Sequence, residues 1–246
     1  MGNIFPRWSN TVPVKAVVAL LLLGGGVTAG INYYSTPKYL RVGYQPTQPV
    51  HYDHSFHAGE LGLDCRYCHH GVDKSAHAGV PSANVCMTCH KSVMPNSPAL
   101  KPIRDSYFGE DTNKDGKLGE DEDKDGDGQI TQGLPVPWVR IHKAPEYVYF
   151  NHAIHVNRGV SCVECHGRVD QMKEVRHEKH LSMAFCLECH RHPENALRPM
   201  GKVTDLSWVA SGSGDVDPSA IQAHAGLNLK KKWGVNPPLS CTGCHR

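Results

Sequence analysis

The chain has few of the residues that normally build a hydrophobic core. Of its 246 residues only 39% are hydrophobic and 7% are aromatic, whereas glycine (24) and proline (17) are plentiful. A chain of this length can form one or two domains, but its side chains supply little apolar surface for a conventional interior. We therefore expect a large apolar group to complete the core, so that folding depends on binding it.

The sequence also lacks a strong charge imbalance and an unpaired cysteine. Its formal net charge is +2 at pH 7, which gives no support for a nucleic-acid-binding protein. All ten cysteines form C-x-x-C pairs, and a histidine follows each of the five pairs. Zinc sites would not require that histidine every time, and a disulfide framework would not favour the paired spacing. Both alternatives are therefore disfavoured.

C-x-x-C-H is the attachment signature of c-type haem, because the two thiols form thioethers to the porphyrin and the histidine faces the iron as its proximal ligand. Composition alone would put histidine after all five pairs with a chance of about one in a million. The sequence therefore predicts five covalently bound haem c groups, which would supply the missing apolar surface. The predicted attachment residues are Cys65, Cys68, His69, Cys86, Cys89, His90, Cys162, Cys165, His166, Cys186, Cys189, His190, Cys241, Cys244 and His245.

An internal repeat organises four of the five motifs. Residues 52–57 match residues 150–155 in the order aromatic, Asp or Asn, His, small, apolar, His. Two C-x-x-C-H motifs follow each run, so the chain contains two dihaem repeats. The fifth motif stands alone at the C-terminal end.

Each iron needs a second axial ligand, and the two H-x-x-H pairs are the best source. Residues three apart share one helical face, so the two histidines of a pair can serve two different haems. We expect His54 on the first iron and His152 on the third, with His57 and His155 reaching neighbouring haems. His142 is the first choice for the remaining distal ligand. Further candidates are His70, His77, His177, His180, His192, His224, Met172 and Met183. Ligation by either methionine would give one His/Met site with a raised reduction potential.

An iron with two strong protein ligands has no open position, which small-molecule catalysis at haem requires. The sequence contains no C-x-x-C-K variant, which would suggest a haem specialised for catalysis. We therefore expect an electron-transfer protein with no catalytic residue of its own, rather than an enzyme.

The N-terminal region predicts a membrane anchor. Residues 16–34 are apolar, follow Arg7 and Lys15, and end at two tyrosines, Tyr33 and Tyr34. The segment is either a cleaved signal peptide or a retained span, and the lack of a clean small-x-small cleavage site favours the span. The preceding basic residues orient it with the N-terminus in the cytoplasm. The haem domain is then expected on the periplasmic face of the cytoplasmic membrane.

An acidic insert between the two repeats resembles a calcium-binding loop. Asp111, Asn113, Asp115 and Glu122 occupy positions that supply oxygen ligands in such loops. A second partial copy follows at once and has Leu134 at its last ligand position. No room exists for the helices of an EF-hand pair, so the insert predicts either one structural calcium or a solvated acidic turn.

The expected fold is mainly α-helical with much irregular coil and short helices at the motifs. A single transmembrane helix precedes a multihaem cytochrome c domain of class III-like character, with two dihaem repeats and a C-terminal haem. In order, the expected parts are a cytoplasmic N-terminus (1–15), an anchor (16–34), a tether (35–50), the first dihaem block (51–94), the acidic insert (95–137), the second dihaem block (138–192) and a linker with the fifth site (193–246).

Five stretches resemble the pentahaem cytochrome c component of bacterial alternative complex III, a quinol:electron-acceptor oxidoreductase. They are LDCRYCH at 63–69, VCMTCHKS at 85–92, IHKAPEYVYFNHAIH at 141–155, CVECHGRVDQM at 162–172 and LSMAFCLECHR at 181–191. The resemblance covers nearly the whole chain outside 95–135. It strengthens His142 as a ligand and draws attention to Met172 and Met183.

This resemblance implies a component of a membrane respiratory complex. Quinol would be oxidised by partner subunits that hold iron–sulfur clusters and integral membrane quinol sites. The haems would pass electrons to a soluble acceptor, an oxidase or the monohaem cytochrome c of the complex.

Three other functions remain open from the sequence. The first is a membrane-anchored multihaem quinol dehydrogenase that feeds a periplasmic reductase. The second is a multihaem reductase with one open iron. The third is a soluble shuttle that resembles the small class III cytochromes, which requires the apolar N-terminus to be cleaved.

Overall fold

The computed structural model describes residues 6–35, 40–109, 133–211 and 217–245, and it divides the chain into two units, residues 1–43 and 44–246. The first unit contains a 3₁₀ turn, η1 (Arg7–Thr11), and the long helix α1 (Val12–Ser35). Pro13 occupies the first turn of α1, where its missing N–H is tolerated. The helix extends a few residues beyond the predicted 16–34 segment.

All side chains of α1 are solvent-exposed in this structure, including the run Leu20–Leu23. At 24 residues and a rise of 1.5 Å per residue, the helix is about 36 Å long, against about 30 Å for the hydrocarbon core of a bilayer. By length and composition it can cross a membrane, although a signal sequence would satisfy the same criteria. The predicted N-terminal apolar helix is thus present.

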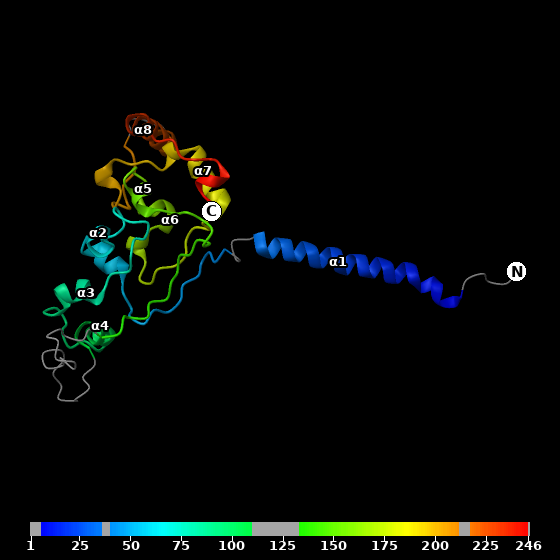
Figure 1. The fold of residues 1–246 in the computed structure, drawn as a ribbon, viewed down its shortest axis with the longest axis horizontal. Helices are drawn as coiled ribbons and strands as arrows, with labels where there is room; N and C mark the ends of the chain where they lie inside the picture. Colours follow the sequence, from blue (N-terminus) through cyan, green and yellow to red (C-terminus); the bar gives the residue numbers. More distant parts are fainter. Residues whose placement is uncertain (1–5, 36–39, 110–132, 212–216, 246) are drawn as a thin grey trace. The chain divides into compact units, whose positions relative to one another are not determined.

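The second unit consists of short helices joined by long irregular segments (Figure 1). Within the described residues no β-strand occurs, and only two isolated bridges form, between Val148 and His245 and between Val160 and Leu197. This confirms the mainly helical fold class. The α-helices are α2 (Cys65–Cys68), α3 (Ala83–His90), α4 (Lys101–Phe108), α5 (His152–Val156), α6 (Cys162–His166), α7 (Met183–Arg191) and α8 (Pro218–Trp233). The remaining turns are η2 (Ser55–Glu60, a π turn) and the 3₁₀ turns η3 (Pro98–Leu100), η4 (Val169–Gln171), η5 (Pro193–Asn195), η6 (Met200–Lys202) and η7 (Cys241–Gly243).

Every C-x-x-C-H motif begins on or lies within a helical turn, and an oxygen-bearing side chain stands at the N-cap of each. Such residues favour helix starts because they can accept from the free N–H groups of the first turn. The Asp64 carboxylate accepts from the Arg66 N–H ahead of α2, and the Ser182 hydroxyl accepts from the Phe185 N–H at α7. The other N-cap residues are Ser82, Ser161 and Ser240.

The two H-x-x-H turns begin in the same way. Oδ1 of Asp53 accepts from the N–H of Phe56 at 3.1 Å, and Oδ1 of Asn151 accepts from the N–H of Ile154 at 3.4 Å. In each case the side chain directly before the first histidine caps the turn, because it accepts from the N–H of the residue three positions later. The Asp/Asn position of the repeat therefore has a structural role in both copies.

Buried apolar side chains form small clusters, as the composition predicts. One joins Val50, Ala83, Met87 and Ile103, so α3 packs on α4. Another joins Val72, Val156 and Val203 from three distant parts of the chain. Figure 1 shows α3 and α4 side by side, with α8 beside α7. These clusters are too small to form the interior of the unit by side chains alone.

Helix α8 packs against η5, and a glycine allows the close approach. Gly226 is buried, and a β-carbon there would overlap the backbone carbonyl of Glu194. The ammonium of Lys230 pairs with the carboxylate of Glu194 at 2.9 Å in the same contact. Close packing of two backbones thus fixes α8 over the turn that follows the fourth motif.

Gly226→Ala is expected to destabilise the haem domain by about 1–3 kcal/mol, because the added methyl group meets backbone that cannot easily move. Thermal unfolding followed by circular dichroism measures this change. Gly201→Ala is the matched control, since a β-carbon at Gly201 meets nothing within 4 Å. Equal melting temperatures for the two variants would contradict the packing argument.

Candidate haem-binding centres

Three of the predicted proximal histidines share one hydrogen-bonding pattern. Nδ1 donates to a backbone carbonyl from His69 to Gly79 at 2.7 Å, from His90 to Val93 at 2.9 Å, and from His190 to Pro238 at 2.8 Å. A carbonyl can only accept, so the proton sits on Nδ1 and the lone pair of Nε2 is left for a metal. Histidines that ligate metals commonly have this arrangement.

Three of the predicted distal histidines have the same arrangement. Nδ1 of His57 lies 2.8 Å from the carbonyl oxygen of Asp53, and Nδ1 of His155 lies 2.8 Å from that of Asn151. Nδ1 of His152 donates across the chain to the carbonyl of Ala76 at 2.9 Å. The donor set therefore fits an iron bound through Nε2.

These three distal histidines each face a proximal histidine. Ring centroids lie 6.4 Å apart for His57 and His90, 6.3 Å for His152 and His166, and 6.2 Å for His155 and His190. Two imidazoles on opposite sides of one metal ion, with metal–nitrogen bonds of about 2 Å, have centroids roughly 6 Å apart. The three pairs thus have the spacing that a shared iron requires.

His54 differs from the other distal candidates. Its Nδ1 is buried, and among the described residues it has no hydrogen-bond partner. Burial lowers the pKa of His54 to about 4, with smaller effects from the neighbouring His69 and His57. A buried polar nitrogen without a partner is unfavourable, so this neutral ring, close to His69, fits a site that a bound group completes.

Burial keeps other histidines of the site neutral. It lowers the pKa of His166 to about 3, with further lowering by neighbouring histidines, and it also lowers the pKa of His155. Only the neutral imidazole can bind a metal, because protonation removes the lone pair. These rings therefore keep the ligand form throughout the physiological pH range.

The cysteines of different motifs come together in an order that differs from their order in the sequence. Cys86 lies near Cys68, and the thiol of Cys65 donates to that of Cys162, which raises the pKa of Cys65. Cys165 lies near both Cys186 and Cys189, and Cys186 near Cys244. The motifs thus form a continuous series: second, first, third, fourth, fifth.

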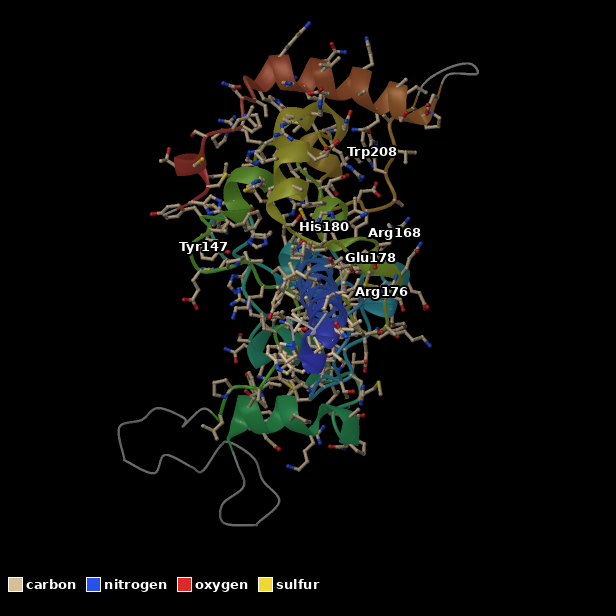
Figure 2. The ribbon with its side chains drawn as sticks, turned by 90° about the vertical axis from the view of Figure 1, so that its right-hand side faces the viewer. Tyr147, Arg168, Arg176, Glu178, His180 and Trp208 are labelled. Atoms are coloured by element: carbon tan, nitrogen blue, oxygen red, sulfur yellow. The ribbon has the colours of Figure 1, made fainter. Side chains whose placement is uncertain are left out.

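The fifth motif is held by the segment that leads into α5. The N–H of Tyr149 donates to the carbonyl of Cys244 at 2.7 Å, and Val148 forms a bridge with His245. The ring of Tyr147, labelled in Figure 2, stacks on the imidazole of His245 with centroids 5.8 Å apart. The last motif therefore depends on residues almost a hundred positions earlier.

The structure places His142 beside the third motif. Its Nε2 lies 3.4 Å from Nδ1 of His166, and its ring centroid lies 4.4 Å from that of His166 and 5.1 Å from that of His177. Burial lowers the pKa of His142 to about 4, so its ring is neutral. This contact favours a hydrogen-bonding role toward His166. The role of His142 as the distal ligand of the fifth iron stays a prediction.

The remaining ligand candidates are scattered. Met172 is only 6% exposed and its carbonyl accepts from the N–H of Ser55, whereas Met183 is 66% exposed. His180 contacts the hydroxyl of Ser182 at 2.8 Å, and His192 pairs with Glu194 at 3.5 Å. His70, His77 and His224 are exposed. The predicted calcium residues Asp111, Asn113, Asp115 and Glu122 lie outside the described residues.

A cavity of about 430 Å³ lies next to α6 and has a basic rim. Arg168 pairs with Asp170 at 2.6 Å, and Arg176 pairs with Glu178 at 2.7 Å. Figure 2 labels Arg168, Arg176 and Glu178 at this site. Most of the positive charge at the cavity is thus balanced within the chain.

The carbonyl partners of the histidines have no signature in the sequence. Gly79, Val93, Ala76 and Pro238 contribute only backbone oxygens, and their side chains carry no signal of this role. In the sequence, Tyr52 and Phe150 are visible only as the aromatic position of the repeat. Their contacts with both histidines of each pair emerge only in the structure.

Comparison with known proteins supports the cofactor assignment. The class III cytochrome c family matches residues 34–110, which include the first two motifs. The multihaem cytochrome c subunit of menaquinone reductase from Nitratidesulfovibrio vulgaris (strain Hildenborough) is 27% identical over 202 residues, covering 82% of this chain and 78% of that protein. A class III cytochrome c domain, a type of domain that binds haem c covalently, therefore follows the N-terminal apolar helix in this chain.

Proposed function

We propose that this chain is the pentahaem electron-transfer subunit of a membrane-bound quinone oxidoreductase of the type that includes alternative complex III. The observation that carries the proposal is the continuous series of five attachment motifs, which includes all ten cysteines. The menaquinone-reductase relative supports the quinone-linked role. Helix α1 supports attachment to the membrane by a single span. The basic residues Arg7 and Lys15 near its N-terminal end favour a haem domain on the periplasmic face.

The chain's own residues act as ligands and spacers in this proposal. When bound, each haem c supplies a one-electron couple at its iron. Cys65, Cys162 and the other motif cysteines would fix the positions of the five groups, and the facing histidine pairs would hold the second, third and fourth irons from both sides. An iron that is held on both sides has no place for a substrate, which favours electron transfer over catalysis by the chain itself.

The second and fifth motifs stand at the two ends of the series, and electrons would enter at one and leave at the other. Partner subunits with iron–sulfur clusters and quinone sites would contact one end. A monohaem cytochrome c or another carrier would contact the other. The direction depends on the potentials of the partners, since the same series of haems serves quinol oxidation and quinone reduction equally.

Purification from detergent-solubilised membranes should bring down integral membrane proteins and an iron–sulfur protein together with this chain. The preparation should exchange electrons between a quinone and a c-type cytochrome, which is measured by the haem absorption band. A chain that salt alone releases from the membrane, without partners, would contradict the proposal.

Replacement of single histidines tests the proposed ligands. His152→Ala should convert about one haem in five to a high-spin form, because the iron opposite His166 loses its distal ligand. His142→Ala should leave all haems low-spin, because His142 contacts the other ring nitrogen of His166. Electron paramagnetic resonance and the visible spectrum measure the spin state, and the pyridine haemochrome assay checks that both variants carry the same amount of haem. A high-spin signal from His142→Ala alone would reverse the assignment.

A further inference from the structure

The two H-x-x-H turns share a third contact besides the cap and the carbonyl bond. In the first turn the ring of Tyr52 stacks on His57, with centroids 4.4 Å apart and planes 25° apart, and meets His54 edge-on at 4.6 Å and 85°. In the second turn the ring of Phe150 stacks on His155 at 4.8 Å and 30°, and meets His152 edge-on at 4.7 Å and 84°. One aromatic ring thus contacts both histidines of its pair, with nearly the same geometry in two places.

This geometry restricts the rotation of both imidazoles. The second histidine of each pair is held at Nδ1 by the carbonyl four residues earlier, and the stacked ring covers one face of it. The first histidine cannot turn toward the aromatic ring without losing the edge-on contact, which suits the charge distribution of aromatic rings. The aromatic residue therefore sets the planes of two imidazoles at once.

We propose that Tyr52 and Phe150 are positioning residues, each of which orients the distal ligands of two different haems. The proposal rests on the ligand assignment under the proposed function, in which the two histidines of a pair serve two irons. It follows that a change at one aromatic position alters two haems together. Tyr52 would act on the first and second haems, and Phe150 on the third and fourth.

The two copies differ in one group, the hydroxyl of Tyr52. This hydroxyl donates to the sulfur of Cys68, and Tyr52 also lies near Cys65 and Cys86. Tyr52 thus contacts attachment residues of the first two motifs as well as both distal histidines. Phe150 lacks a hydroxyl, so the shared positioning role belongs to the ring, and the hydroxyl is a separate contact of the first copy.

Four variants of the full chain, purified as the haem-loaded complex, test the proposal. Tyr52→Leu and Phe150→Leu remove the flat ring, whereas Tyr52→Phe and Phe150→Tyr keep it. The measurements are haem content by pyridine haemochrome, the low-spin g values by electron paramagnetic resonance, and a potentiometric titration. These measurements report ligand orientation and need no turnover by the complex.

Each leucine variant should retain five haems and shift the low-spin signals of two of them, with a different two in each variant. Each conservative variant should keep the native g values, because the ring remains. Native signals in both fully loaded leucine variants, or a shift of one haem only, would overturn the proposal. If one leucine variant loads fewer haems, the other tests the same claim at a separate place in the chain.

His57→Ala separates a failure of this proposal from a failure of the ligand assignment. A high-spin haem in His57→Ala, together with native signals in Tyr52→Leu and Phe150→Leu, would overturn the positioning role and leave the ligand intact. If His57→Ala leaves every haem in its native low-spin form, the ligand assignment on which the proposal rests is wrong. The expected result is a high-spin signal in His57→Ala and shifted low-spin signals in the leucine variants.

Discussion

The hydrogen bond from Nδ1 of a histidine to a backbone carbonyl is the interaction on which the candidate centres depend. It puts the proton on the nitrogen away from the metal and turns Nε2 toward the site. Among the described residues, six of the predicted ligand histidines make this bond. The accepting carbonyl lies four residues before the ring in the case of Asp53 and His57, and in a different part of the chain in the case of Pro238 and His190. The long-range bonds also tie the motifs to one another, so ligand orientation and tertiary structure have a common cause.

The small clusters of buried side chains also lie around the motifs. Val72, Val156 and Val203 come from three separate segments, and they lie close to the turns that carry the motifs rather than in a core apart from them. A chain with so little apolar surface cannot fix its long irregular segments by packing alone. Covalent attachment at ten cysteines would close many loops at once and supply apolar surface beside each motif. Local caps such as Asp64 and Ser182 then need to define only one or two helical turns each.

The helical turns at the motifs, the N-terminal helix and the mainly helical class could be predicted from the sequence, because each depends on local residue patterns. The spacing of H-x-x-H and the cap at Asp53 or Asn151 are likewise local, so the turns could be expected. The order of the motifs in space could not, because it depends on contacts such as that between Cys65 and Cys162, which nearly a hundred residues separate. His142 illustrates how far a local sequence pattern can predict the role of a residue. Its position before the second block predicts a ligand, and that role stays a prediction, whereas its contact with Nδ1 of His166 could be found only in the structure.

The series of motifs bears on how a pentahaem chain can join two partners. The two repeats meet where Cys65 of the first contacts Cys162 of the second, and the other motif of each repeat lies next to its first motif. The fifth motif adds to the second repeat through Cys186 and Cys244, and it is held by Tyr149 rather than by a repeat of its own. A duplicated dihaem unit would by itself have two similar ends. The C-terminal addition makes the ends different, and different ends are what a carrier between two unlike partners requires.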